Sequence, residues 1–117
     1  MSVLRTERID GVCVARPRED IDAATARRVR DALVECLDEG GDSLVVDLSE
    51  TRYIDSAGID MLFRLSELLR ERRARLQLVI PRESNLARLA GIVALPSVVP
   101  VHETVEFALA ATRETAA

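Results

Sequence analysis

The chain opens with two short strand-like runs separated by a tight-turn dipeptide. Residues 3–9 mix apolar and charged positions, residues 12–15 are apolar, and Asp10-Gly11 lies between them. An Asp-Gly pair in this position is a strong hairpin signal, because both residues tolerate the positive φ angles of a two-residue turn. The pattern therefore predicts an antiparallel pair of strands at the N-terminus.

Apolar residues then recur at the three- and four-residue spacing of a helix. Asp22 is a candidate N-cap for this helix, and Gly40-Gly41 is its stop signal. The expected apolar stripe consists of Ala26, Val29, Leu33, Cys36 and Leu37.

The rest of the chain alternates short apolar runs with helical stripes. Residues 44–48 are rich in Val, as in a strand that is buried on both faces. A second helix is expected from Ser56 to the arginine-rich stretch 70–75, which we interpret as a solvated helix end. Further along we expect a strand at 76–80, a short helix capped by Ser84 or Asn85 and ending at Gly91, a strand at 98–101, and a last helix that begins at His102.

This order of elements predicts the fold class α/β. It requires a mixed, mostly parallel sheet of about five strands with an N-terminal β-hairpin and about four helices, all in one domain over residues 1–117. In such a sheet the loops that follow parallel strands meet at one edge, so the loops at 17–22, 49–56 and 81–84 should converge. Functional residues are expected there.

Composition narrows the possible functions. The net charge is −4, whereas binding to nucleic-acid phosphates requires a basic surface, so no nucleic-acid partner is expected. Apolar runs are too short for membrane insertion and the first ten residues lack the apolar core of a secretory signal, so the expected location is cytoplasmic. Cys13 and Cys36 lie in apolar stretches without a metal-binding spacing and are expected to be buried thiols.

Catalysis by this chain is not expected. All sixteen basic residues are Arg, which excludes lysine chemistry, and the Gly-x-Ser-x-Gly motif of hydrolases is absent. His102 is the one histidine in the sequence, and nothing pairs it with a nucleophile. Asp47, Asp55 and Asp60 are better explained by a strand end and a helix start than by a metal site. The sequence therefore predicts no catalytic residue, metal or cofactor.

Ser56 is the candidate modification site. It directly precedes the stripe of the second helix, where it is the expected N-cap, a role worth about 1 kcal/mol. A phosphate at this position would face free backbone N–H groups and the positive end of the helix dipole, so the fold would tolerate it. Asp55 and Asp60 flank Ser56, and the added negative charge would penalise a docking partner. These features leave two interpretations of Ser56 open, a helix cap alone or a cap that is also a phosphorylation switch.

The stretch 45–65, VVDLSETRYIDSAGIDMLFRL, resembles the signature of STAS domains, the sulfate-transporter and anti-sigma-antagonist family. Residues 19–29, EDIDAATARRV, resemble the acidic loop and first helix of that family, and residues 85–109 its last helix-strand-helix segment. Glu19 departs from the Gly that many members carry in the loop, and Ala57 replaces a second Ser at the motif. The resemblance covers nearly the whole chain.

The resemblance implies an anti-sigma factor antagonist that is regulated at Ser56. Unphosphorylated protein would bind an anti-sigma factor that is also a serine kinase and so release a sigma factor, and a serine phosphatase would reverse the modification. ATP would belong to the kinase. By the same resemblance, the candidate partner-binding residues are Asp22, Thr25, Asp55, Gly58, Ile59 and Met61.

A second function within the same fold stays open at this point. Some small STAS proteins are accessory subunits of lipid-trafficking ABC transporters, and others build stress-signalling scaffolds, because a fold does not determine a function. The Asp55-Ser56 pair and the loop from Asp22 onward favour the switch. The sequence does not specify the oligomeric state.

Overall fold

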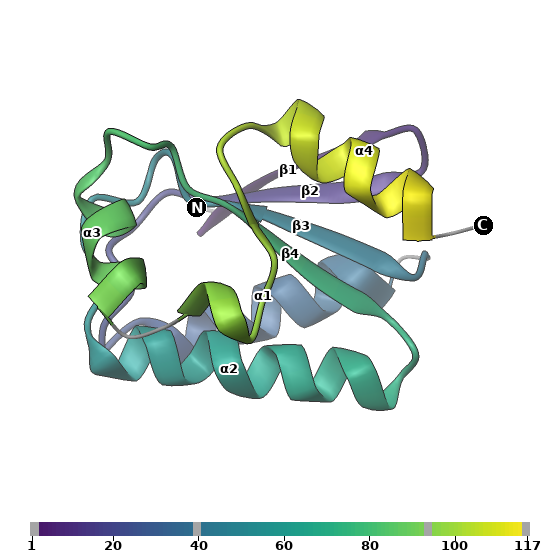
Figure 1. The fold of residues 1–117 in the computed structure, drawn as a ribbon. Helices are drawn as coiled ribbons and strands as arrows, with labels where there is room; N and C mark the ends of the chain where they lie inside the picture. The colour runs from purple at the N-terminus through teal and green to yellow at the C-terminus, as the bar shows by residue number, and fades with distance from the viewer. Residues whose placement is uncertain (1–2, 39–40, 93–94, 116–117) are drawn as a thin grey trace.

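The chain forms a three-layer α/β structure. The computed structural model describes residues 3–38, 41–92 and 95–115. Helices α1 (Ala26–Asp38) and α2 (Ser56–Glu71) lie side by side against one face of the central sheet, and α4 (Val105–Thr115) covers the opposite face (Figure 1). The fold class predicted from the sequence is confirmed.

The sheet has five strands in the order β1-β2-β3-β4-β5. The β1–β2 pair is antiparallel and every later pair is parallel. Asp10 and Gly11 join the first two strands with φ angles of 53° and 81°, which is the positive-φ turn expected from their sequence. The strands are β1 Leu4–Ile9, β2 Val12–Pro17, β3 Ser43–Asp47, β4 Arg75–Val79 and β5 Val101–His102.

Helices α2 and α3 begin within one residue of their predicted starts. Ser84 caps the third helix, since its Oγ accepts a hydrogen bond from the Ala87 backbone at 3.3 Å. Among the described residues, no helix is both long and apolar enough to cross a lipid bilayer. The bounds are α1 Ala26–Asp38, α2 Ser56–Glu71, α3 Asn85–Ile92 and α4 Val105–Thr115, with a short 3₁₀ helix at Leu95–Ser97.

Two apolar layers hold the sheet between the helices. The larger layer packs α1 and α2 on the sheet, with Leu33, Leu62 and Leu65 fully buried. The smaller one packs α4 on the other face through Val45, Val79 and other apolar residues. Every residue of β3 is buried, as its Val-rich sequence predicts.

A buried acid ties the sheet to its N-terminal hairpin. Asp47, at the end of β3, is 4% exposed and accepts a hydrogen bond from Arg16 Nε at 2.9 Å. Arg16 also donates to Glu7 at 2.5 Å. Burial opposes the charge of Arg16, but its bonds to Glu7 and Asp47 outweigh burial and raise the pKa of the guanidinium. Asp47 therefore has a structural role.

Two predictions near the C-terminus are wrong. The strand expected at 98–101 is reduced to Val101–His102, because the preceding residues form a 3₁₀ helix and a turn that bury Leu95 and Val99. His102 lies in this strand and does not begin the last helix. Thr104 caps that helix, since its Oγ1 accepts from the Phe107 backbone at 3.1 Å.

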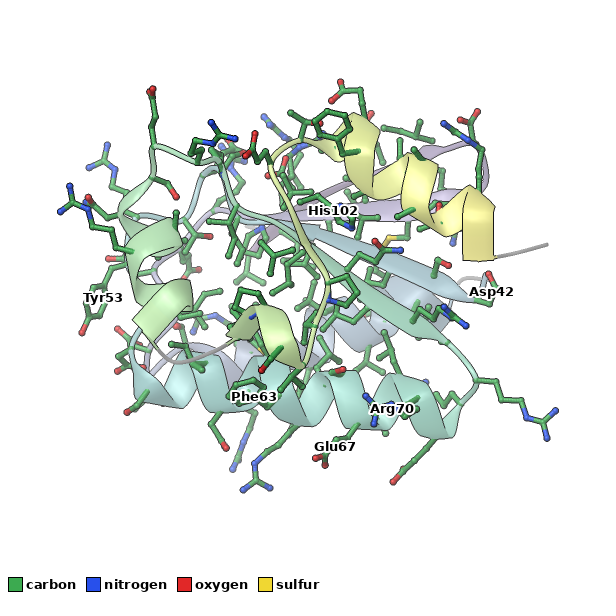
Figure 2. The ribbon with its side chains drawn as sticks, in the orientation of Figure 1. Asp42, Tyr53, Phe63, Glu67, Arg70 and His102 are labelled. Carbon is green, nitrogen blue, oxygen red and sulfur yellow. A yellow bond between two sulfur atoms is a disulfide. The ribbon has the colours of Figure 1, made fainter. Side chains whose placement is uncertain are left out.

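The prediction of two separate buried thiols is also wrong in one respect. Cys13 on β2 and Cys36 on α1 are both buried, but the structure joins their sulfur atoms in a disulfide across the larger core (Figure 2). The two residues are 23 positions apart and meet only because α1 packs on the face of β2. Sequence spacing alone did not reveal that contact.

Candidate functional site

The candidate site forms where two loops are joined by a pair of isoleucines. Ile21, after β2, and Ile54, before α2, form an isolated parallel bridge. The Ile21 backbone N–H donates to the Tyr53 carbonyl at 3.0 Å, and the Asp55 N–H donates to the Ile21 carbonyl at 3.2 Å. The predicted convergence of the first two loops is therefore observed, and α3, which follows the third loop, lies at the same end of the sheet (Figure 1).

Gly58 allows α2 to approach this bridge closely. A Cβ atom at Gly58 would lie 2.5 Å from the Ile21 carbonyl oxygen and 2.5 Å from Ile54 Cγ1. Real Cβ atoms essentially never make contacts that short. The first turn of α2 is thus in direct contact with both loops, and this contact requires a residue without a side chain.

Asp55 caps α2, which corrects the assignment of Ser56 as the N-cap. Asp55 has extended backbone angles, and its Oδ1 accepts a hydrogen bond from the Gly58 N–H at 3.1 Å. Ser56 is the first residue of the helix proper. Both residues have capping chemistry, and the chain enters the helix one residue earlier than the sequence suggested.

The Ser56 hydroxyl is consequently available. Ser56 is exposed, and within the described ranges its side chain has no hydrogen-bond partner. The backbone N–H groups of Ser56 and Ala57 are likewise not used by the cap, which takes the N–H of Gly58. A hydroxyl at the open end of a helix with two free N–H groups beside it can carry a phosphate without a change of fold.

Asp22 and Thr25 hold the neighbouring loop in shape. Asp22 Oδ1 accepts from the backbone N–H groups of Ala24 at 2.9 Å and Thr25 at 3.1 Å. The Thr25 hydroxyl donates to the Asp20 carbonyl at 2.7 Å and accepts from the Asp22 N–H at 2.9 Å. Both side chains are half-buried, so they form a rigid rim beside Ser56.

The predicted partner-binding residues divide into two groups by exposure. Asp22, Thr25 and Asp55 are partly exposed and lie in the two joined loops. Gly58, Ile59 and Met61 are buried, with Ile59 and Met61 only 6% and 5% exposed. The buried group supports the surface from beneath, and its burial argues against a direct contact with a partner.

The sequence analysis missed Tyr53. Its side chain is 55% exposed, which makes it one of three large apolar residues on the surface of the described chain. It directly precedes the Ile54 bridge, and Figure 2 shows it projecting from the end of the molecule where α2 begins. An aromatic residue in a predicted functional loop was the signal that could have identified it.

Negative charge surrounds Ser56. Asp55 caps the helix and Asp60 lies one turn further on, where it accepts a hydrogen bond from Arg64 at 2.7 Å. That bond raises the pKa of the Arg64 guanidinium. Within the described part of the chain, no three His, Cys, Asp or Glu side chains are grouped so that they could hold a metal ion.

Comparison with known proteins identifies the family. The family model for the STAS domain matches residues 4–108, which include every element that forms the site. The chain belongs to the STAS domain family. The resemblance carried by residues 45–65 is thereby confirmed.

Relatives of this STAS chain share a common description. BtrV of Bordetella bronchiseptica, described as a candidate anti-sigma factor antagonist, is 28% identical over 110 residues, which cover 92% of each chain. An anti-sigma factor antagonist from Mycobacterium paratuberculosis is 26% identical, with a TM-score of 0.81 over 94% of this chain and 92% of that one. These descriptions name a regulatory activity and no catalysis.

The same fold occurs in SpoIIAA, an anti-sigma factor antagonist solved in two forms. The unphosphorylated form matches with a TM-score of 0.67 at 18% identity, over 94% of this chain and 97% of that one. The phosphorylated form from Bacillus matches with a TM-score of 0.64 at 15% identity, over 93% and 98% of the two chains. At these identities the likeness shows the fold.

Proposed function

We propose that this chain is an anti-sigma factor antagonist whose binding to an anti-sigma factor is switched by phosphorylation of Ser56. The observation that carries the proposal is the exposed Ser56 hydroxyl, which Asp55 leaves unused by capping the helix in its place. The relatives described as anti-sigma factor antagonists support the partner class.

The unphosphorylated surface suits a protein partner. Exposed Tyr53 supplies apolar contact area, while Asp22 and Thr25 present a rim held in place by hydrogen bonds. A surface that is already ordered loses little conformational entropy on binding. The neighbouring carboxylates favour a basic patch on the anti-sigma factor.

Phosphorylation would act mainly through charge. A phosphate adds about −1.5 to −2 charges at neutral pH, next to the carboxylates of Asp55 and Asp60. The free N–H groups of Ser56 and Ala57 and the helix dipole stabilise it in the folded chain. The partner would meet a bulkier and more negative surface on an unchanged fold, so binding would weaken. The chain itself performs no catalysis, and the partner kinase supplies ATP.

The test compares four forms of the protein as affinity baits in extracts of the source cell. Wild type and Ser56→Ala should retain an anti-sigma factor that carries a serine-kinase domain, and Ser56→Asp should lose most of it. Thr6→Asp, an exposed position on the edge strand β1, adds the same charge away from the site and should bind like wild type. Mass spectrometry identifies the retained proteins.

A second step locates the modification. The retained kinase, incubated with the chain and Mg-ATP, should place phosphate on Ser56, and a serine phosphatase should remove it and restore binding. Phosphate on another residue, or equal binding by Ser56→Ala and Ser56→Asp, contradicts the switch. Retention of ABC-transporter or stress-scaffold subunits by all baits would assign the chain to the alternative function.

A further inference from the structure

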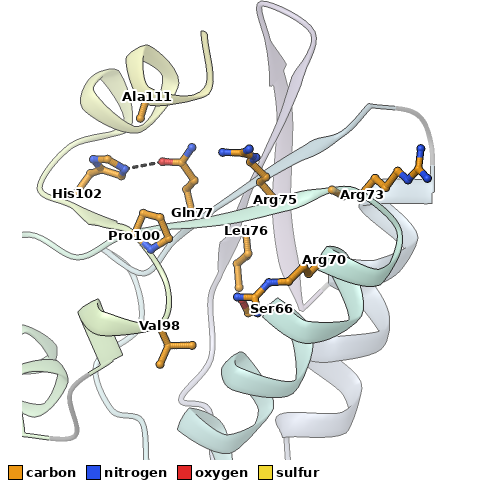
Figure 3. Close-up of a pocket in the computed structure, with 11 residues that line it drawn as sticks. Ser66, Arg70, Arg73, Arg75, Leu76, Gln77, Val98, Pro100, His102 and Ala111 are labelled. Atoms are coloured by element: carbon orange, nitrogen blue, oxygen red, sulfur yellow. Dashed lines mark hydrogen bonds between the residues drawn. The ribbon is translucent and has the colours of Figure 1, made fainter. Parts of the chain in front are cut away.

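A pocket of about 510 Å³ lies at the end of α2 opposite to Ser56 (Figure 3). It opens between the last turns of α2, strand β4, the segment that leads into β5, and α4. Its volume is within the range of small-molecule sites in proteins. The lining residues are Ser66, Arg70, Arg73, Ala74, Arg75, Leu76, Gln77, Val98, Pro100, His102 and Ala111.

The pocket exists because β5 is too short to cover β4. The two strands pair only at Leu78 and Val79. The Leu78 N–H donates to the Pro100 carbonyl at 2.9 Å, and the Ile80 N–H donates to the His102 carbonyl at 2.9 Å. Alternate residues of β4 therefore direct their backbone groups toward β5.

By the same alternation, the backbone N–H and C=O of Leu76 face the pocket. Pro100, the next residue of the β5 side in that register, has no N–H and cannot donate to the Leu76 carbonyl. This part of the sheet edge is therefore open to a ligand.

Positive charge borders the pocket on both faces of the sheet. Figure 3 shows the side chains of Arg70, from α2, and Arg75, from β4, directed toward the pocket, whereas Arg73 extends away from it. None of the lining residues is acidic. Across the described ranges, none of these three guanidinium groups takes part in an ion pair, so their charges are not neutralised internally.

Gln77 supplies a positioned neutral donor. Its Oε1 accepts a hydrogen bond from His102 Nε2 at 2.5 Å, which fixes the orientation of the amide. The amide nitrogen is then left to donate, and Figure 3 shows it on the side nearer Arg75. The remaining wall is apolar and includes Val98 and Pro100.

We propose that this pocket binds a small organic anion. Its carboxylate or phosphate group would lie at the uncovered edge of β4, where Arg75 and the Gln77 amide approach it from one face of the sheet and Arg70 from the other. Guanidinium groups bind such anions in paired hydrogen bonds. The apolar body of the ligand would pack against Val98 and Pro100. The site is separate from Ser56 and does not depend on the switch.

The test is titration of the ¹⁵N-labelled full chain, followed by NMR, with four probes: benzoate, phenyl phosphate, neutral benzyl alcohol and inorganic phosphate. Benzoate or phenyl phosphate should shift the amide signals of Arg75, Leu76, Gln77 and His102 in a saturable way. Benzyl alcohol and inorganic phosphate should each bind at least about tenfold more weakly. Benzyl alcohol lacks the negative charge, and inorganic phosphate lacks the apolar body.

Matched variants locate the charge recognition. The double variant Arg70→Gln/Arg75→Gln should weaken binding at least about tenfold, and Arg73→Gln, whose side chain points away, should stay within about twofold of wild type. Unchanged amide signals outside the pocket would show that the variants fold. If the double variant does not fold, Arg70→Gln and Arg75→Gln are titrated separately.

Several outcomes overturn the proposal. These are shifts that never saturate or spread over the surface, equal binding of benzyl alcohol and benzoate, equal binding of inorganic phosphate and phenyl phosphate, or wild-type affinity in the double variant. A failure here leaves the Ser56 proposal untouched, because that test measures a different ligand at a different end of α2.

Discussion

The two ends of helix α2 are built in different ways. At its N-terminal end the helix contacts two loops so closely that Gly58 has no space for a methyl group, and Asp55 satisfies the first turn. At its C-terminal end the helix faces a sheet edge that β5 leaves uncovered, and Arg70 borders the resulting pocket. The N-terminal end of α2 is therefore tightly packed, and its C-terminal end borders an uncovered part of the sheet.

The two ends also differ in charge. Asp55 caps the N-terminal end and Arg70 lies in the last turn, so each of these two charges complements the helix dipole, while Glu67 and Glu71 are also near the C-terminal end. The two ends therefore favour opposite ligands: a basic protein surface near Ser56 and a small anion near Arg70. Four predictions test whether the ends differ in rigidity and charge as described.

The largest effect is expected from Gly58→Ala. The new methyl group would lie 2.5 Å from the Ile21 carbonyl and from Ile54, so the bridge between the two loops must move. We expect the free energy of unfolding to fall by about 3 kcal/mol, measured by urea denaturation. Ala57→Gly, one residue earlier, changes the same first turn in the opposite sense and should cost about 1 kcal/mol or less. Similar losses in both variants would show that the close contact is unimportant.

A smaller effect separates Asp55 from Ser56. Asp55→Ala removes the cap and should lower the free energy of unfolding by about 1 kcal/mol. Ser56→Ala should change it by less than about 0.5 kcal/mol, because the hydroxyl has no structural partner in the described chain. Denaturation of the two variants side by side checks this, and a reversed order would reinstate Ser56 as the cap.

The sequence predicted the position of this site better than its details. The Asp10-Gly11 turn, the buried β3 and the α2 stripe are local patterns, and they were enough to give the fold and bring the loops together. The choice between Asp55 and Ser56 as the cap depends on backbone angles at one residue. The burial of Met61 depends on packing across elements. Neither quantity is encoded in local spacing.

At the other end of α2, loss of a guanidinium should hardly affect the fold. Arg70→Gln removes a charge that is not paired within the described chain, so only its interaction with the helix dipole is lost. We expect a decrease of at most about 0.5 kcal/mol in urea denaturation. A loss as large as that of Asp55→Ala would mean that Arg70 is part of the structure rather than of an open pocket.

The sequence did not reveal this pocket. The arginines at 70–75 were interpreted as a solvated helix end, which is correct for Arg73 but incomplete for Arg70 and Arg75. The difference arises because β5 begins only at Val101, after a 3₁₀ helix and a turn. The part of β4 that stays uncovered depends on where β5 begins. The strand predicted at 98–101 placed that start too early in the sequence.

The smallest effect concerns pH and His102. Burial lowers the pKa of His102 from its ordinary value of 6.5, so the unfolded chain binds this proton more readily than the folded chain. The contribution to stability is therefore fully present above pH 6.5 and is lost as pH falls from there through the lower folded value. Between about pH 7.5 and about pH 5, urea denaturation should show a steeper decrease for wild type than for His102→Gln. Parallel curves would show that His102 is not desolvated.

The bridge between Ile21 and Ile54 has one further consequence. It joins positions 33 residues apart, so the surface around Ser56 does not exist until β2, α1 and β3 are all in place. A nascent, nicked or partly unfolded chain could carry both loops in its sequence and still present neither in the correct arrangement. A partner that contacts both loops would therefore bind only chains in which these elements are folded together. Damaged copies would not bind, so they would not contribute to signalling even without a separate quality-control step.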